Sequence, residues 1–86
     1  MLAFDPDKDA INIAKHGVSL ALAVAMEILT VREDTRRDYG ETRYIALGLI
    51  DGGRYCLVFA DRAGSVRAIS LRRAHTKEFE RYVSRT

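Results

Sequence analysis

The stretch RYIALGLIDGGRYCLVFADRAGSVRAISLRR, residues 43–73, decides the fold. It contains three runs rich in apolar and β-branched residues, separated by the sequences DGG and DRAG. Glycine-containing turns between such runs are typical of β-hairpins. We therefore predict three antiparallel strands joined as a meander, at Arg43–Ile50, Arg54–Ala60 and Ser65–Arg73.

Alternation along these strands divides their side chains between two faces, because neighbouring side chains point to opposite sides of a sheet. We assign the bulky set to the face that helices cover: Ile45, Leu47, Leu49, Tyr55, Leu57, Phe59, Ile69 and Leu71. The opposite face then carries small residues with polar ends: Tyr44, Ala46, Gly48, Arg54, Cys56, Val58, Ala60, Ala68, Ser70 and Arg72. Small side chains leave a shallow groove, in which Arg72 would stand. The adjacent Arg73 would point to the helix-covered side.

The N-terminal sequence FDPDKDAINIAKHG carries the signals of one helix. Asp5 is a suitable N-cap, Pro6 suits the first helical position, and Gly17 is a typical C-terminal stop. Ser19 is expected to cap a second helix, LALAVAMEIL, which is apolar nearly all round. Such a segment is expected to be buried against the sheet.

The remaining elements are a short first strand, a further strand before the charged loop, and a last helix, at Leu2–Phe4, around Val31, and from about His75 to Val83. The chain is thus predicted to form one α+β domain over residues 1–86. Its antiparallel sheet would have about four strands, packed against two N-terminal helices and followed by a C-terminal helix.

The composition limits the class of protein. A single cysteine, Cys56, excludes an internal disulfide, and His16 and His75 lie too far apart for a metal-site spacing. No apolar run approaches the ~18–20 residues of a membrane span, and the N-terminus lacks the order of a signal peptide. We expect a cytoplasmic protein without membrane association, metal or cofactor.

Eleven of the fourteen basic residues are arginine, although the formal net charge is only +2. One explanation of this excess is an anionic partner, because arginine presents a planar fork of donors that suits phosphate. A GC-rich genome, which favours arginine codons, explains the excess equally well. RNA supplies its own nucleophile, the 2′-hydroxyl, so an enzyme that cleaves it needs an acid, a base and charge stabilisation. A set of basic and aromatic residues could supply these functions. Such residues more often stand in solvent at the ends of strands, without a function in catalysis. The set comprises Lys15, His16, Arg43, Tyr44, Arg54, Arg72, His75 and Tyr82.

Two candidate residues each have two interpretations. Glu78 lies three residues after His75, as in a capping box, but it also shares a helical face with Tyr82 and could act beside Arg72. His16 could be a general acid or base, or it could interact with the C-terminal carbonyls of its own helix.

Three motifs in one order together resemble the BrnT family of bacterial type II toxins: FDPDK…N…KHGVS (Phe4–Ser19), DYGETRYIALG (Asp38–Gly48) and ISLRRAHTKEFERY (Ile69–Tyr82). The resemblance implies a RelE-like fold and an endoribonuclease that inhibits translation. It also implies neutralisation by a BrnA-type antitoxin, through which alone the toxin would meet operator DNA. The family's motif positions fall on Lys8, Asn12, Lys15, His16, Gly17, Glu41, Arg43, Arg72, Arg73, Ala74, Glu78 and Tyr82.

The sequence departs from the family pattern at two places. Leu20–Leu22 stands where acidic residues are usual, and His75 stands where a small hydroxyl or amide residue is usual. The first departure removes a capping interaction from the second helix and makes its face more apolar. The second either weakens the cap of the last helix or gives His75 a different task. Neither changes Arg72.

The first hypothesis is a metal-independent endoribonuclease toxin with RNA as substrate. Arg72 would stabilise the scissile phosphate, Glu78 or His16 would be the acid or base, and Tyr82 would support them. The expected RNA-binding residues are Lys15, Arg43, Arg54 and Arg73. The alternative hypothesis is a non-catalytic binding module, such as a decayed toxin acting as co-repressor within an antitoxin complex.

Overall fold

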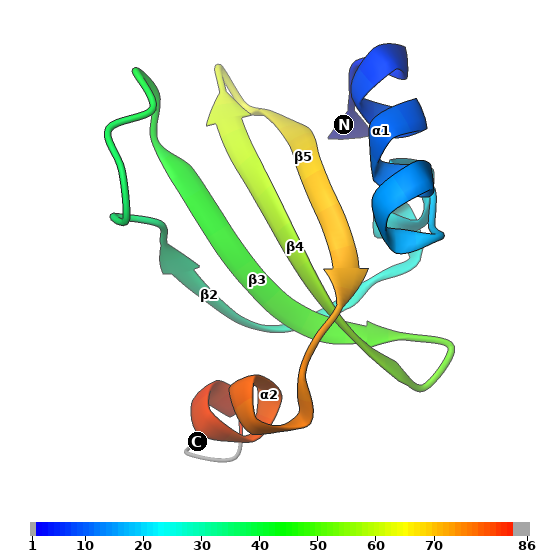
Figure 1. The fold of residues 1–86 in the computed structure, drawn as a ribbon. Helices are drawn as coiled ribbons and strands as arrows, with labels where there is room; N and C mark the ends of the chain where they lie inside the picture. The colour runs from blue at the N-terminus through cyan, green and yellow to red at the C-terminus, as the bar shows by residue number, and fades with distance from the viewer. Residues whose placement is uncertain (1, 84–86) are drawn as a thin grey trace.

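A computed structural model gives the structure of the chain, and it describes residues 2–83 apart from the side chain of Arg62. The described elements are, in order, β1 (Leu2–Ala3), α1 (Pro6–His16), the 3-10 helix η1 (Leu20–Ala25), β2 (Glu27–Glu33), β3 (Arg43–Ile50), β4 (Gly53–Arg62), β5 (Ser65–Arg73) and α2 (Thr76–Val83). Their strands form one sheet in the order β1-β5-β4-β3-β2, in which β1 is parallel to β5 and the other pairs are antiparallel (Figure 1). The α+β class and the meander are confirmed. The expected antiparallel sheet of about four strands is corrected, because the sheet has five strands and β1 joins it in parallel.

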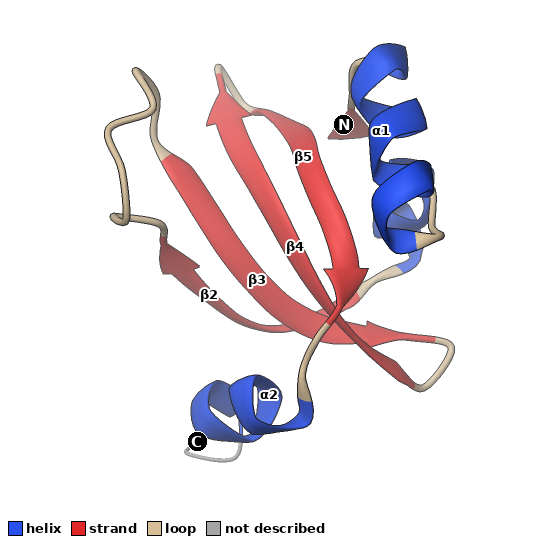
Figure 2. Cartoon of the chain, viewed as in Figure 1, coloured by secondary structure: helices blue, strands red, loops and turns tan. Residues whose placement is uncertain are grey.

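The sheet buries apolar side chains on both faces. On one face η1 contributes Leu20, which packs against Leu57 and Leu71. On the other face α2 covers part of a second cluster that contains Leu47 and Cys56. We call this second surface the α2 face; by register it comprises Arg43, Ile45, Leu47, Cys56, Val58, Ser70 and Arg72. Figure 2 shows α1 standing beside β5 and α2 lying across one end of the sheet.

The first helix begins and ends where the sequence predicts. Asp5 accepts a hydrogen bond from the Asp7 amide at 2.8 Å, and Pro6 is the first helical residue. Gly17 ends the helix in the left-handed region at φ 74°, and its amide donates to the Ile13 carbonyl at 2.8 Å. A residue with a Cβ is strained in that conformation, so glycine is suited to this position.

The predicted second α-helix is wrong. Ser19 caps as expected, by accepting from the Ala21 amide, but only η1 follows, and β2 begins at Glu27. The last residues of the predicted helix pair with β3 as part of a strand instead. Gly48 allows this pairing, because a Cβ at that position would collide with the Glu27 carbonyl oxygen. The expected burial against the sheet holds for Leu20, which is 0% exposed, but not for the whole segment, since Val24 is 80% exposed.

The assignment of faces is correct within β3 and β4 and between β4 and residues 70–73 of β5, but it is wrong between β3 and β4. Leu47 pairs with Cys56, so the bulky residues of β3 share a face with the small residues of β4. In β5 a bulge makes Ile69 an extra residue, which shifts the alternation before it. The two arginines do separate as predicted, because Arg72 pairs with Cys56 and Arg73 pairs with Tyr55, the residue before Cys56 in β4.

Candidate functional site

One buried side chain fixes α1 against the sheet. β1 covers the edge of β5 only near Val66, and beyond it Asn12 pairs with the backbone of Leu71 as a neighbouring strand would. The Asn12 amide donates to the Leu71 carbonyl at 2.8 Å and accepts from the Leu71 amide at 3.0 Å. It also donates to the Val18 carbonyl at 2.8 Å. These bonds hold the exposed side of α1 next to the α2 face.

A basic pocket of about 230 Å³ lies between α1, β3 and β5. It is lined by Lys8, Ile11, Asn12, Lys15, His16, Arg43, Ile69 and Ser70. Three of these residues are permanent cations, one is a histidine, and none is a carboxylate. Such a concave cluster of cations attracts an anionic group.

Arg43 reaches the basic pocket from β3 with its guanidinium held on two sides. Its Nε lies 3.3 Å from Oε2 of Glu41, and its guanidinium lies 4.2 Å from the centre of the Tyr39 ring. A cation over an aromatic face is stabilised by the ring quadrupole. Arg43 is therefore positioned before any ligand binds.

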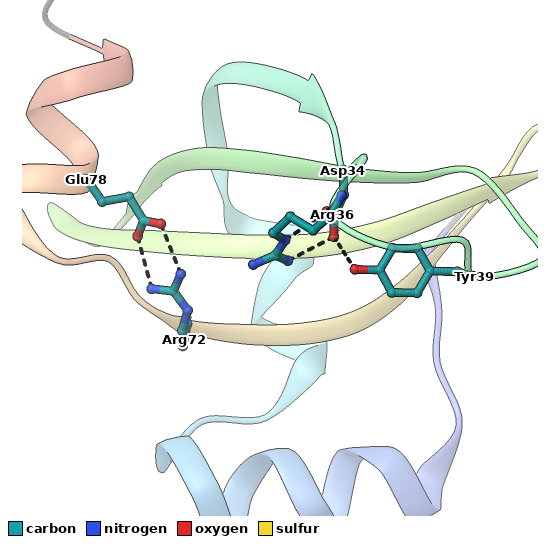
Figure 3. Close-up of polar contacts among 5 residues, drawn as sticks. All are labelled: Asp34, Arg36, Tyr39, Arg72 and Glu78. Atoms are coloured by element: carbon teal, nitrogen blue, oxygen red, sulfur yellow. Dashed lines mark hydrogen bonds and ion pairs between the residues drawn. The ribbon is translucent and has the colours of Figure 1, made fainter.

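The loop that carries Tyr39 is itself anchored on a buried carboxylate. Asp34 accepts from Nε and Nη2 of Arg36, both at 2.8 Å, and from the Tyr39 hydroxyl at 3.0 Å (Figure 3). Hydrogen bonds from the Arg36 guanidinium hold the pKa of Asp34 well below its usual range. A charged loop is ordinarily a solvated segment, but the loop between β2 and β3 is held by these hydrogen bonds to Asp34.

Arg72 and Glu78 form a two-pronged ion pair on the α2 face (Figure 3). Nη1 and Nη2 of Arg72 lie 3.0 and 3.1 Å from the two carboxylate oxygens of Glu78, and Nη1 also donates to the Arg73 carbonyl at 3.2 Å. Hydrogen bonds from Arg72 lower the pKa of Glu78. Both carboxylate oxygens thus face Arg72 instead of capping the helix. The first bond of α2 runs from the Phe79 amide to the His75 carbonyl.

Two further side chains stand close to this pair. The Arg32 guanidinium lies 3.8 Å from the centre of the Tyr82 ring, and among the described residues its buried Nη1 has no hydrogen-bond partner. The Cys56 thiol is buried, and this burial raises its pKa while Arg72 lowers it to a smaller extent. A buried thiol with a raised pKa is a poor nucleophile. The sequence analysis missed Arg32, which only a strand assignment over β2 would have placed on this face.

The structure thus divides the predicted site residues into three groups. Lys15, His16 and Arg43 line the basic pocket, whereas Arg72, Glu78 and Tyr82 lie together under and within α2. Ser70 connects these two groups, since it lines the pocket and precedes Arg72 by two residues on the same face, roughly 7 Å along the strand. The other two residues lie apart: Arg54 contacts Thr76 at 3.4 Å beside α2, and Arg73 lies over Tyr55 on the opposite face.

Two absences apply to residues 2–83, the part of the chain that the structure describes. No helix there is long and apolar enough to cross a membrane. No three His, Cys, Asp or Glu side chains among residues 2–83 are grouped so that they could hold a metal ion.

Comparison with known proteins gives one family. No curated protein matches the chain. The family model described as the ribonuclease toxin BrnT of type II toxin–antitoxin systems matches residues 4–78, which span α1, the sheet and the Arg72–Glu78 pair. The chain therefore belongs to the BrnT family of type II ribonuclease toxins.

Proposed function

We propose that the chain is a metal-independent endoribonuclease whose RNA lies across the α2 face, from the basic pocket to Arg72. The observation that carries this proposal is the pocket itself, which gathers Lys8, Lys15 and Arg43 around His16 without a carboxylate in its lining. Phosphate contacts of this kind fix the position of an RNA strand without reading its sequence.

The cleavage step uses the nucleophile that RNA carries. The 2′-oxygen forms a bond to the adjacent phosphorus while the bond from phosphorus to the 5′-oxygen breaks. The proton of the 2′-hydroxyl passes to a base, and the departing 5′-oxygen takes a proton from an acid. His16 is our candidate for this proton transfer, because it is the pocket residue that can both accept and donate. Arg72 would stabilise the charge that builds on the phosphate oxygens.

Glu78 is better suited to orient Arg72 than to act as the base. Its lowered pKa keeps it ionised and weakly basic at neutral pH, and its two oxygens already hold the guanidinium. Arginine has five N–H donors, and three of Arg72 are engaged, so two have no partner among the described residues and can face a phosphate. Tyr82 supports the same surface through its contact with Arg32.

The proposed function includes inhibition of translation and a protein partner. A type II toxin is held inactive by a protein antitoxin, which we propose is of the BrnA type and carries the contact with operator DNA. Arg54, beside α2, would extend the RNA path. Arg73 points to the opposite face and lies outside the proposed path.

The test of this function is induced expression of the chain in bacterial cells. Wild type should arrest growth and degrade RNA, and Arg72→Ala should relieve both. Arg73→Ala is the matched control, since it removes the adjacent arginine from the other face, and it should remain toxic. Full toxicity of Arg72→Ala would show that the site is wrong. Purified wild type that binds RNA without cutting it would favour the non-catalytic module instead.

A further inference from the structure

Exposed apolar side chains gather on η1 and β2. Five of the seven large apolar residues that are exposed lie here: Leu22, Val24, Ile28, Leu29 and Val31. We call these five residues the η1–β2 strip. Val31 is 48% exposed, and η1 has no charged residue. These five exposed apolar residues lie within ten positions of the chain, and exposed apolar side chains that gather on a small protein are typical of an interaction site.

The strip lies on an open sheet edge. Within residues 2–83, β2 pairs with β3 and with no other strand, whereas the opposite edge of the sheet is covered by β1 and by Asn12. An edge strand presents unpaired backbone N–H and C=O groups that can bind an added strand. The charged residues of β2 stand at its ends, and the four residues from Ile28 to Val31 are uncharged.

A second copy of the chain fits this edge poorly. A two-fold dimer would pair β2 with itself in an antiparallel arrangement. When all seven residues overlap, Glu27 of each copy faces Glu33 of the other, so both ends of the pair bring two carboxylates together. Like charges directly opposite each other destabilise a strand pair.

We infer that the antitoxin of this toxin adds an extended segment to β2 as a sixth strand. The segment would be apolar in its middle, beside Ile28 and Val31, which pair with Gly48 and Ala46 and so share one face across the bulge at Leu29. It would be basic at its ends, where it faces Glu27 and Glu33. This inference rests on membership of a type II toxin family, which has a protein antitoxin, and not on the proposed cleavage. The antitoxin would hold the toxin from the edge of the sheet, apart from the basic pocket.

The experiment measures the affinity of the purified toxin for the protein encoded beside its gene. All toxins carry Arg72→Ala, so they can be produced whether or not the chain cleaves RNA, and the assay contains no RNA. Val31→Lys is compared with Ile13→Lys, because Ile13 is 47% exposed on α1, almost the same fraction as Val31. We expect Val31→Lys to weaken binding at least tenfold and Ile13→Lys to change it less than twofold.

Hydrogen exchange of the same complex gives a readout that does not depend on the variants. Amides of β2 should become protected when the antitoxin binds. Equal affinity of both lysine variants, or protection confined to α1 and α2, would overturn the inference. A toxin dimer that dissociates in Val31→Lys would assign the strip to a second copy instead. If the antitoxin does not bind at β2, the proposed cleavage of RNA by the wild-type toxin is not thereby refuted. If the wild-type toxin does not cleave RNA, the binding result still stands.

Discussion

Replacing Asn12 with alanine should destabilise the protein strongly, because this side chain ties α1 to the edge of β5. Asn12 is 4% exposed and makes three hydrogen bonds with the backbone of Val18 and Leu71. Each such bond contributes about 1 kcal/mol net, and the substitution leaves its buried backbone partners unsatisfied. The expected loss is therefore about 3 kcal/mol, against a total stability of roughly 4–13 kcal/mol for a chain of this length.

Urea unfolding followed by circular dichroism measures this loss. The midpoint should fall with an unchanged m-value, and a thermal scan should show a decrease of roughly 12–24 °C in Tm. Ile13→Ala is the control, since it removes an exposed side chain from the next position of α1 and should change stability by less than about 0.5 kcal/mol. A loss below about 1 kcal/mol for Asn12→Ala would refute the reasoning that these bonds hold α1 beside the sheet.

Three further predictions test the packing, the ion pair and the basic pocket. Gly48→Ala should cost about 1–3 kcal/mol in urea unfolding and should speed hydrogen exchange in β2, because the added methyl group collides with the backbone of that strand; an unchanged midpoint would contradict the close approach. Glu78→Gln should lower stability by about 1 kcal/mol at pH 7. Because pairing with Arg72 lowers the folded pKa of Glu78 below its ordinary 4.5, this contribution is present above about pH 4.5 and is lost as the pH falls through the folded value, so the wild type and the variant should converge in acid. A constant difference across that range would show that the ion pair is not its source. Lys15→Ala should reduce the slope of RNA affinity against salt by about 0.7, whereas Arg73→Ala on the opposite face should leave the slope unchanged, and equal slopes for the two variants would count against the pocket.

Local signals in the sequence predicted much of the fold. The DGG and DRAG turns placed the meander, and Asp5 with Gly17 placed α1, because turns and caps depend on residues a few positions apart. The opposite placement of Arg72 and Arg73 follows from strand alternation alone and is confirmed by their partners in β4.

Features that depend on contacts between distant segments were not predictable. The apolar run after Ser19 fits a helix by composition, and only the space that Gly48 opens beside it makes β2 a strand. The register that pairs Leu47 with Cys56 is likewise a property of two strands together, so alternation could not decide which faces match.

The sequence named candidate site residues but could not give their geometry. The family motifs name Lys15 and Arg43, yet only the docking of α1 through Asn12 brings them into one pocket. The two interpretations of Glu78 could be separated only when the structure placed both of its oxygens against Arg72. The Arg32–Tyr82 contact depends on β2, which extends through Arg32, whereas the sequence predicted only a strand around Val31 and then the charged loop.

The central claim is that Arg72 on the α2 face stabilises the phosphate during RNA cleavage. Initial rates of cleavage of a labelled single-stranded RNA by purified protein, with a metal chelator present, test it most directly. The account predicts that wild type and Arg73→Ala cleave at similar rates and that Arg72→Ala is slower by roughly 10²–10³-fold. Cleavage by Arg72→Ala at the wild-type rate, with Arg73→Ala impaired, would contradict it.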